Sequence, residues 1–457
     1  MMEEGRVSFV PCVKWVKRGV TRQNPYVVEL SEKQLGDILD TAKREVKAAE
    51  DEVAAGSGSD EYNMEKYDEE GCTEALFGVA SAAVFASNAR DPLVTGGDSD
   101  SEAEDDAIKP DDNLVAVGRV DDDASVLEVY VYNHDEGSLY VHHDLLLPSI
   151  PLCLEWLDRG NMLAVGGMDH IIAVWDLDVV NCLEPALKLG RKKRQQRMGH
   201  KDAVLDVSWN PVLPHLLASG SVDRTVLLWD LDTGIASSAL PVFGEKVQAL
   251  QWNPAESCTL LVGSCDHTLH LFECRSNRSK TWAASGEVER VVWDHFNPFY
   301  FLASTGNGNI EYFDVRADGP LWCVPAHEKE VAGLALSSKC PGLLVSAGSE
   351  GVAKVWDLKT SKPEFVTERK MKLGSIQCLD PNPDLPFIMC AGGDNKKNNF
   401  RVWDVLGVSR EAKEVFSSRP LVTSGLEPMK TSDTMQAFEF LHLGQSTSTD
   451  VSPERTN

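Results

Sequence analysis

Long hydrophobic runs are absent from this sequence, and its first residues contain no apolar segment of the kind found in signal peptides. A membrane-spanning helix needs about 20 predominantly apolar residues, so we expect neither a membrane protein nor a secreted one. The 11 cysteines are scattered singly, with no CxxC pair and no cluster with histidine. This pattern argues against a zinc site and a disulfide framework, and it favours a reducing compartment.

Catalytic motifs are also missing. The sequence has no P-loop, no GxSxG or HExxH motif, no GxGxxG turn between a strand and a helix, and no EF-hand loop. Its glycine-rich pieces, such as Gly306-Asn-Gly308, stand where turns between strands need a positive φ. We therefore expect a protein that is not an enzyme, with no cofactor, no metal and no small-molecule substrate.

Basic residues are outnumbered, because 44 lysines and arginines stand against 71 acidic residues, for a formal net charge of −27. Such a balance argues against direct nucleic-acid binding, since affinity for phosphates comes largely from lysine and arginine. The charge is nevertheless uneven, with 20 acidic and 4 basic residues between Glu45 and Asp112. The rest of the chain is less acidic, and its basic residues are concentrated in particular loops.

What the sequence does contain is a repeat. Seven segments end in an aromatic residue followed by Asp, Asn or Glu: Tyr132-Asn133, Trp175-Asp176, Trp229-Asp230, Phe272-Glu273, Phe313-Asp314, Trp356-Asp357 and Trp403-Asp404. Successive segments are 43, 54, 43, 41, 43 and 47 residues apart, which is the period of a four-stranded propeller blade. We predict an all-β fold, a seven-bladed β-propeller.

The fullest repeat matches the WD40 signature through His200, Ser219, Asp223 and Trp229. We predict that Asp223 accepts a hydrogen bond from His200, that the imidazole faces Ser219 or Ser221, and that this serine contacts the Trp229 indole. The alternative is a catalytic pair of His200 and Asp223. We favour a structural relay, because the same pair recurs as a brace in WD40 blades.

A second copy of this relay is less complete. Ala326-His327, with Glu350 and Trp356, comes nearest to the full pattern. The repeats that end at Phe272 and Phe313 lack both the histidine and the tryptophan. We therefore expect the hydrogen-bonded brace in some blades only.

The strand pattern extends to the beginning of the sequence, where the stretch that ends at Trp15 resembles the strands that end at Trp209 and Trp252. We predict that residues 8–19 form the first strand of blade 1 and that residues 20–111 are inserted after it. The propeller then occupies residues 112–422. Residues 423–457, rich in Ser, Thr and Pro, are predicted to form a flexible tail.

The inserted segment has two parts. A capping box at Ser31 and Gln34 precedes apolar residues at helical spacing, which predicts a helix at about residues 31–53. Residues 54–112 are rich in Gly, Ser, Asp and Glu and are predicted to be acidic and disordered. Ser99 and Ser101 each precede an acidic residue by three positions, a pattern that suits acid-directed kinases.

An extra basic loop accounts for the 54-residue step between the second and third repeats. Its basic residues are Lys188, Arg191, Lys192, Lys193, Arg194 and Arg197. Such a cluster is typical of a nuclear-import signal or of a surface that contacts RNA or DNA. The two roles are compatible, and a simply solvated loop is the third interpretation.

Several stretches outside the repeat signature carry a more specific resemblance. They include the opening Cys12-Val-Lys-Trp15-Val-Lys-Arg-Gly19, the stretch Lys66-Tyr67-Asp-Glu-Glu-Gly71, and Glu289-Arg290-Val-Val-Trp293-Asp-His295-Phe. In these the chain resembles the periodic tryptophan protein 1 family of WD40-repeat proteins. The resemblance implies a nuclear, largely nucleolar, non-enzymatic scaffold in ribosome production. Its expected partners are the proteins and rRNA of pre-ribosomal particles, with histones and rDNA chromatin as further candidates.

The resemblance leaves two activities open. One is assembly of the large ribosomal subunit and processing of its pre-rRNA, and the other is regulation of rDNA transcription by RNA polymerase I on chromatin. A third hypothesis, a substrate receptor of a cullin ubiquitin ligase, rests on a Trp-Asp-x-Arg ending. Only Phe313-Asp314-Val-Arg316 approaches that ending, and its tryptophan is absent.

Overall fold

The computed structural model describes residues 7–28, 107–122, 124–190, 198–240, 243–275, 278–360 and 362–422. The predicted helix, most of the acidic segment and the predicted tail therefore lie outside the described residues. The chain divides into two compact units, Tyr26–Ala107 and the remainder. Of the first unit, the structure describes only residues 26–28, which include the short strand β2 (Tyr26–Val27), and Ala107.

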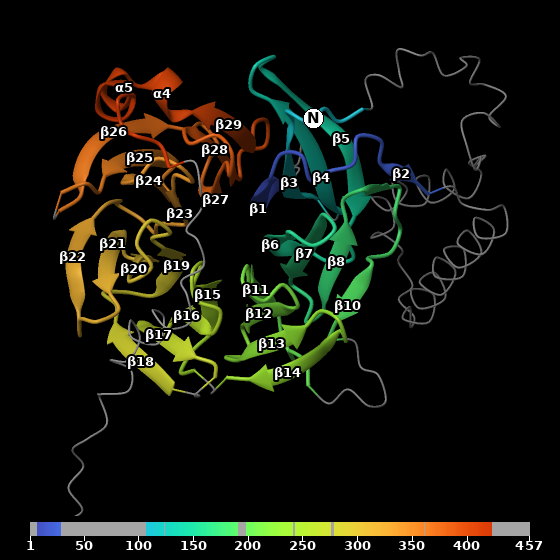
Figure 1. Cartoon of the computed structure of the whole chain (residues 1–457), viewed down its shortest axis with the longest axis horizontal. Helices are drawn as coiled ribbons and strands as arrows, with labels where there is room; N and C mark the ends of the chain where they lie inside the picture. The colour runs from blue at the N-terminus through green and yellow to red at the C-terminus, as the bar shows by residue number, and fades with distance from the viewer. Residues whose placement is uncertain are drawn as a thin grey trace, which may run out of the picture. The chain divides into compact units, whose positions relative to one another are not determined.

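The second unit is a seven-bladed propeller whose sheets are arranged in a ring (Figure 1), and its inner strands line a central channel. Six blades are four-stranded antiparallel sheets and the seventh has three strands. Blade 1 has β1 (Ser8–Val16), β3 (Asn113–Asp121), β4 (Ala124–Asn133) and β5 (Ser138–Leu146), and blade 2 has β6 (Pro151–Leu157), β7 (Met162–Gly167), β8 (Ile172–Asp176) and β10 (Leu187–Leu189). The two-residue strand β9 (Val179–Val180) lies between β8 and β10 in the sequence.

The remaining blades follow in sequence order, each from its innermost strand outward. Blade 3 has β11 (Val204–Trp209), β12 (Leu216–Ser221), β13 (Val226–Asp230) and β14 (Ile235–Ala239), and blade 4 has β15 (Val247–Trp252), β16 (Thr259–Ser264), β17 (Thr268–Glu273) and β18 (Arg278–Ala283). Blade 5 has β19 (Val288–Trp293), β20 (Tyr300–Thr305), β21 (Asn309–Asp314) and β22 (Pro320–Pro325), and blade 6 has β23 (Gly333–Leu336), β24 (Leu343–Gly348), β25 (Val352–Asp357) and β26 (Glu364–Lys370). Blade 7 has β27 (Ile376–Pro381), β28 (Ile388–Gly393) and β29 (Phe400–Asp404).

Blade 1 is assembled from two distant parts of the sequence. Strand β1 pairs with β3 in antiparallel register, with Trp15 opposite Val115 and Val16 opposite Leu114. Ile108 and Asp112 fall within the segment predicted to be disordered, yet both are buried. Ile108 packs in the apolar cluster between blades 1 and 2, and the Asp112 carboxylate accepts a hydrogen bond from the side chain of Asn133. The ordered part of the propeller therefore begins before residue 112.

Neighbouring blades pack closely because the second strand of several blades has a glycine where the next blade's valine approaches. An added Cβ atom at Gly220 would lie 2.6 Å from a methyl carbon of Val247, well inside van der Waals contact. Val247 itself is fully buried between blades 3 and 4. This repeated fit of a valine over a glycine sets the close spacing of the inner strands around the channel.

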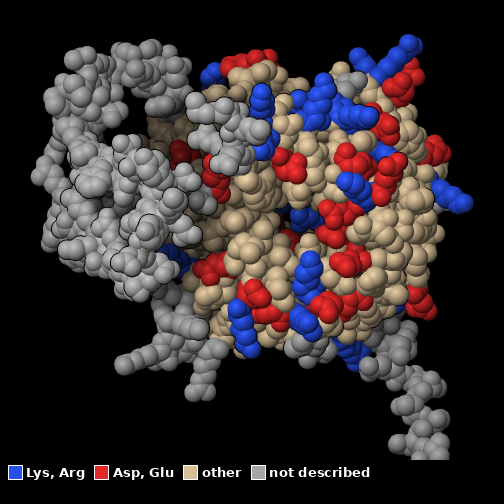
Figure 2. All heavy atoms as spheres, turned by 180° about the vertical axis from the view of Figure 1, so that it is seen from behind, with Lys and Arg blue, Asp and Glu red and all other residues tan. Residues whose placement is uncertain are grey.

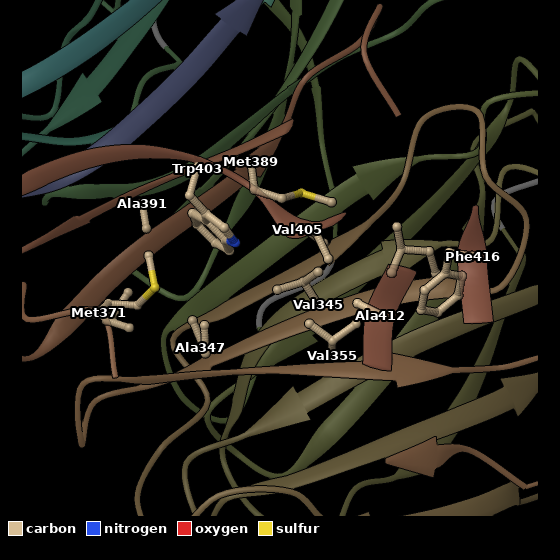
Figure 3. Close-up of a cluster of buried hydrophobic side chains, with 14 of the residues drawn as sticks. Val345, Ala347, Val355, Met371, Met389, Ala391, Trp403, Val405, Ala412 and Phe416 are labelled. Atoms are coloured by element: carbon tan, nitrogen blue, oxygen red, sulfur yellow. The ribbon is translucent and has the colours of Figure 1, made fainter. Parts of the chain in front are cut away.

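Blade 7 departs from the pattern, because two helices follow β29 where a fourth strand was predicted. They are α4 (Val405–Val408) and α5 (Arg410–Phe416), each beginning at a side-chain cap, from Asp404 and Ser409 respectively. Phe416 and Ala412 on α5 are fully buried in an apolar cluster with Trp403, as Figure 3 shows. The capping residues and the buried helix face thus replace the outermost strand of this blade.

An ion pair holds the chain after α5 against blade 6. The Arg419 guanidinium donates hydrogen bonds of 2.9 and 2.6 Å to the two carboxylate oxygens of Asp357. These bonds hold the pKa of Asp357 below its usual value, although burial alone would raise it. Arg419 also stacks on Phe416, with its guanidinium carbon 4.6 Å from the ring centre. The end of the described chain is therefore part of the propeller's packed body.

Candidate functional site

The blade 3 relay connects the loop before β11 with the two strands that follow it. The Nδ1 atom of His200 is 3.1 Å from a carboxylate oxygen of Asp223, and its Nε2 atom is 2.7 Å from the Ser219 hydroxyl. The Trp229 indole N–H donates to the same hydroxyl oxygen at 2.7 Å. Ser219 is therefore the serine of the relay. Ser221, the alternative, instead donates to a backbone oxygen.

The polar groups of this relay are turned inward. The side chains of His200, Ser219 and Trp229 are buried, which leaves no approach for a substrate to the imidazole. Burial alone would raise the pKa of the Asp223 carboxyl, but hydrogen bonds from His200 and Thr225 hold that pKa well below its usual range. A general base must reach the proton that it abstracts, and here the imidazole is already occupied on both nitrogens. The geometry is that of a structural brace.

Blade 6 contains the second relay. The Nε2 atom of His327 is 2.7 Å from the Ser346 hydroxyl, which also accepts a hydrogen bond of 2.9 Å from the Trp356 indole. The other imidazole nitrogen is 2.5 Å from a carboxylate oxygen of Glu350. Burial lowers the pKa of His327, even though Glu350 acts to raise it. Blades 3 and 6 thus share one brace, with glutamate replacing aspartate in blade 6.

The predicted basic loop begins later than its sequence suggested. Lys188 lies within β10, opposite Ala173, and its ammonium group is 3.8 Å from the Glu184 carboxylate. It belongs to the strand because its neighbour Leu189 is fully buried against the blade. The other basic residues of the loop, Arg191, Lys192, Lys193, Arg194 and Arg197, lie outside the described residues. The same holds for the two candidate phosphorylation sites, Ser99 and Ser101.

A second repeated contact joins successive blades around the channel, and sequence reasoning missed it. On the inner strands, the residue before the tryptophan accepts a hydrogen bond from the backbone N–H of the next blade's tryptophan. Glu155 accepts from Trp209 at 3.2 Å, Ser208 from Trp252 at 3.2 Å, Gln251 from Trp293 at 2.7 Å, and Asp380 from Trp15 at 2.9 Å. The available signal was the polar residue before Trp156, Trp209 and Trp252; in blade 7, Pro381 takes the place of the tryptophan, and in blade 5 the residue before Trp293 is the apolar Val292.

Blade 1 breaks this series because its residue, Lys14, can only donate. Its ammonium group lies 2.7 Å from the Glu155 carboxylate and 4.0 Å from that of Asp380, so one cation bridges three blades. Burial by itself would lower the pKa of Lys14, but these two carboxylates raise it above its usual value. Burial raises the pKa of Asp380 to about 6 despite the opposing effect of Lys14.

Two further charged residues of the described chain, Asp206 and Arg290, face the same channel but form no ion pair with each other. Asp206 accepts hydrogen bonds from the backbone N–H groups of Leu250 and Val207, at 2.8 and 3.0 Å, and burial raises its pKa to about 6. The Arg290 guanidinium donates to the backbone oxygen of Ala332 at 3.2 Å. These side chains, with Lys14, line a cavity of about 150 Å³. Figure 2 shows a narrow hollow near the middle of one face, with charged side chains at its rim.

The channel is lined by thiols as well as by charged side chains. Cys12, Cys153 and Cys378 also line the cavity, and burial raises the pKa of each thiol, which keeps it protonated. Among the residues that the structure describes, no group of three or more His, Cys, Asp or Glu side chains is placed to hold a metal ion. A cavity of this size and polarity suits several water molecules.

Two other features bear on the hypotheses from the sequence. The Arg316 guanidinium donates hydrogen bonds of 2.8 and 2.7 Å to Asp314, and it stacks on Phe299 at 4.9 Å. The arginine that approaches the cullin-receptor pattern is thus engaged within its own blade, although it remains partly exposed.

Within the described ranges, no helix combines the length and the apolar character that crossing a bilayer requires.

Comparison with known proteins places these features in a family. Residues 139–176, 192–230 and 319–357 match the family described as "WD domain, G-beta repeat". The chain is 38% identical over 461 residues to the Periodic tryptophan protein 1 homolog of Drosophila melanogaster, which spans 89% of this chain and 99% of that protein. It is 29% identical over 523 residues to Periodic tryptophan protein 1 of Saccharomyces cerevisiae, which spans 90% of each.

Solved structures give the fold independently. The crystal structure of the mitotic checkpoint complex contains a chain that superposes with a TM-score of 0.53, covering 64% of this chain and 84% of that one. The sequence identity is 20%. At this identity, the likeness shows a shared propeller architecture and nothing about shared partners.

Proposed function

The chain belongs to the periodic tryptophan protein 1 family, and we propose that it acts as a non-enzymatic scaffold in ribosome biogenesis, in the nucleus and nucleolus. Its proposed partners are the proteins and the rRNA of precursors of the large ribosomal subunit. The observation that carries this proposal is the similarity over 99% of the length of the Drosophila relative, well beyond the repeat signature. The proposed role is in the processing and assembly of large-subunit pre-rRNA.

The fold suits a scaffold for physical reasons. Two blades are braced internally by buried hydrogen-bonded relays, and successive inner strands are joined by side chains that cross from blade to blade. A ring held in this way presents loops in fixed positions on two faces and around its rim, so several partners can bind at once. The basic loop after Leu189 is proposed to serve nuclear import or RNA contact.

Sedimentation of the endogenous protein through a sucrose gradient tests this proposal. Nuclear extract is divided, and one half is treated with RNase before centrifugation. We expect the protein to migrate with large-subunit precursors and to return to slow fractions after RNase treatment. Slow migration in both samples would refute the proposed role in pre-ribosomal particles.

A second candidate function is regulation of rDNA transcription on chromatin through histone binding. The observation that favours it is the acidic segment, with 20 acidic and 4 basic residues between Glu45 and Asp112. A segment of this charge attracts basic proteins, and phosphorylation of Ser99 and Ser101 would make it more negative. Retention in the chromatin pellet that survives RNase and is lost when residues 54–106 are deleted would support this function over the first.

A further inference from the structure

Basic residues to which the scaffold role assigns nothing lie where the outermost strand of blade 6 adjoins blade 7. Arg369 lies near the end of β26, Lys372 follows in the loop to β27, Lys396 and Lys397 lie in the loop between β28 and β29, and Arg401 lies on β29. The three lysines are exposed, and the two arginines are partly exposed. We refer to these five residues as the blade 7 basic surface.

Hydrogen bonds between the two loops make this a single surface. The Asn395 side chain donates to the backbone oxygen of Lys372 at 3.0 Å, and its backbone N–H donates to Leu373 at 2.9 Å. The backbone N–H of Ser375 donates to the Asp394 carboxylate at 2.7 Å. The lysines on either side of these contacts are therefore held on neighbouring backbone segments. Strands β26, β28 and β29 lie at the top of Figure 1, and Figure 2 shows basic side chains gathered along that edge.

The two arginines form an unusual pair. Burial and the nearby charge of Arg401 both lower the pKa of Arg369. The Nη1 atom of Arg369 is enclosed and has no hydrogen-bond partner. Neither guanidinium forms an ion pair with any other residue in the described part of the chain. A partly buried guanidinium beside a like charge, with one enclosed nitrogen that lacks a partner, is costly, and an anion bound between the two would reduce that cost.

Acidic residues near the surface do not neutralise it. Glu368 is adjacent to Arg369, but it points to the opposite side of β26, where its carboxylate lies 3.9 Å from Lys354. Asp394 is used by the backbone of the facing loop. The surface therefore keeps a net positive charge in a chain whose formal charge is −27.

Strand β29 separates the basic surface from an aromatic contact with blade 1. Blade 7 has no fourth strand, so β29 forms its outer edge. Phe400, which precedes Arg401, packs against Tyr130 of blade 1 with 5.1 Å between ring centres, so its ring lies on the opposite face of β29 from the Arg401 side chain. Arginine and lysine side chains without an adjacent accessible ring suit the phosphate backbone of a nucleic acid, which they contact by charge, better than its bases.

We propose that the blade 7 basic surface binds the phosphate backbone of RNA, with one phosphate between Arg369 and Arg401 and its neighbours along the three loop lysines. Charges spread over two loops and two strands suit a polymer with repeated phosphates better than they suit a single phosphorylated side chain. The inference rests on the proposed function and deepens it, because it names the surface through which the scaffold contacts RNA.

Fluorescence anisotropy with the full-length protein and a labelled 20-nucleotide single-stranded RNA tests the inference across a series of KCl concentrations. The variant is Arg369→Gln with Arg401→Gln. We expect its Kd to rise at least about tenfold, and the slope of log Kd against log salt to fall by about 0.7, since the two arginines share one phosphate and each phosphate contact on a single strand contributes about 0.7. The matched control is Lys201→Gln with Lys329→Gln, which removes two exposed lysines from other blades and should change Kd less than about twofold.

Thermal unfolding of both double variants establishes that they remain folded. Lys396→Gln with Lys397→Gln provides a second variant outside the strands, with a smaller expected loss of affinity. Unchanged RNA affinity in the arginine variant, or an equal loss in the Lys201 and Lys329 control, would overturn the inference. A phosphorylated peptide that binds the surface and displaces RNA at equal concentration would overturn it in favour of a phosphoprotein partner. The proposed function is judged separately, by sedimentation of the wild-type protein.

Discussion

The Asp380 carboxylate accepts a hydrogen bond of 2.9 Å from the backbone N–H of Trp15, a residue 365 positions earlier in the chain. A second bond of 3.2 Å runs from the Trp15 indole to the backbone oxygen of Asp380. These contacts close the ring between blades 7 and 1. Ring closure therefore depends on contacts between the inner strands of blades 7 and 1. Strand β1 joins the sheet of blade 1, and the sheet of blade 7 keeps three strands.

Deleting residues 1–19 should destabilise the whole propeller and not blade 1 alone. The deletion removes β1, whose buried residues Val10, Trp15 and Val16 pack between blades 1 and 7 and against blade 2. Thermal melting followed by circular dichroism measures the effect, and we expect a clearly lower midpoint. The control is deletion of residues 423–457, the predicted tail, which should leave the midpoint unchanged. An unchanged midpoint in the first variant would contradict a stabilising role for β1.

Ser219→Ala should lower the free energy of unfolding by about 1–3 kcal/mol, because it leaves two buried polar groups without their hydrogen-bond partner. The two are His200 Nε2 and the Trp229 indole, each 2.7 Å from the Ser219 hydroxyl. Urea unfolding measures the loss. Ser238→Ala, at an exposed position on β14, is the matched control and should have little effect. Equal stability of the two variants would show that the relay does not brace the blade.

Asp206→Asn should alter how stability depends on pH. Burial raises the pKa of Asp206 to about 6 from an unfolded value near 3.8, although Arg290 acts in the opposite direction. The folded state therefore binds the proton more tightly, so ionisation of Asp206 costs stability above pH 6 and that cost disappears as the pH falls towards 4. The variant should melt higher than wild type at pH 8, and the difference should shrink on going to pH 4.

Thermal melting of both proteins between pH 4 and 8 checks this expectation. Asp144→Asn, at an exposed position on β5, provides the control and should show no such trend. A difference between Asp206→Asn and wild type that stays constant over this range would mean that the carboxyl titrates equally in the folded and unfolded chains. If the midpoint of Asp206→Asn instead rose relative to that of wild type on acidification, the folded pKa of Asp206 would be lowered and not raised.

Phe416→Ala should cost about 3–5 kcal/mol of stability, the usual range for removing a buried aromatic side chain. Phe416 is fully buried where α5 takes the place of an outer strand, and Arg419 stacks on its ring. Val415→Ala is the control, because Val415 lies on the same helix and is 36% exposed. Guanidinium unfolding of both variants gives the comparison. A loss below about 1 kcal/mol for Phe416→Ala would show that α5 adds little to blade 7.

The propeller could be predicted from the sequence because, in each WD40 repeat, residues close together in the chain determine the strands and the turns. The spacing of the tryptophans and their neighbours was enough to locate seven blades. Contacts between blades were harder to foresee, because they join residues such as Glu155 and Trp209 that belong to different repeats. The blades could be counted from the sequence, whereas the bonds that hold one blade to the next required the structure.

The two helices of blade 7 escaped prediction for a local reason. Val405 to Phe416 is short, contains Gly407 and carries no long apolar stripe, so nothing in its pattern argued against the fourth strand that the repeat predicts. Two side-chain caps and the packing of Phe416 on the blade decide its conformation. Arg369 and Arg401 were missed because each is a single basic residue in a strand, and only the fold brings them together. Lys188 was predicted to lie in the basic loop because it is basic like the residues that follow, although the leucines on either side of it indicated a strand.

The split of blade 1 has a consequence for how the chain must fold as it is made. Synthesis proceeds from the N-terminus at about 5–20 residues per second, so the strand containing Trp15 emerges roughly 20 to 70 seconds before Asp380, 365 residues later. During that interval the strand has neither its ring-closing partner nor, at first, β3. A newly made strand with apolar residues and unpaired backbone groups is prone to aggregation. Its protection during translation, by a chaperone or by early pairing with β3, therefore becomes a requirement for producing the folded ring.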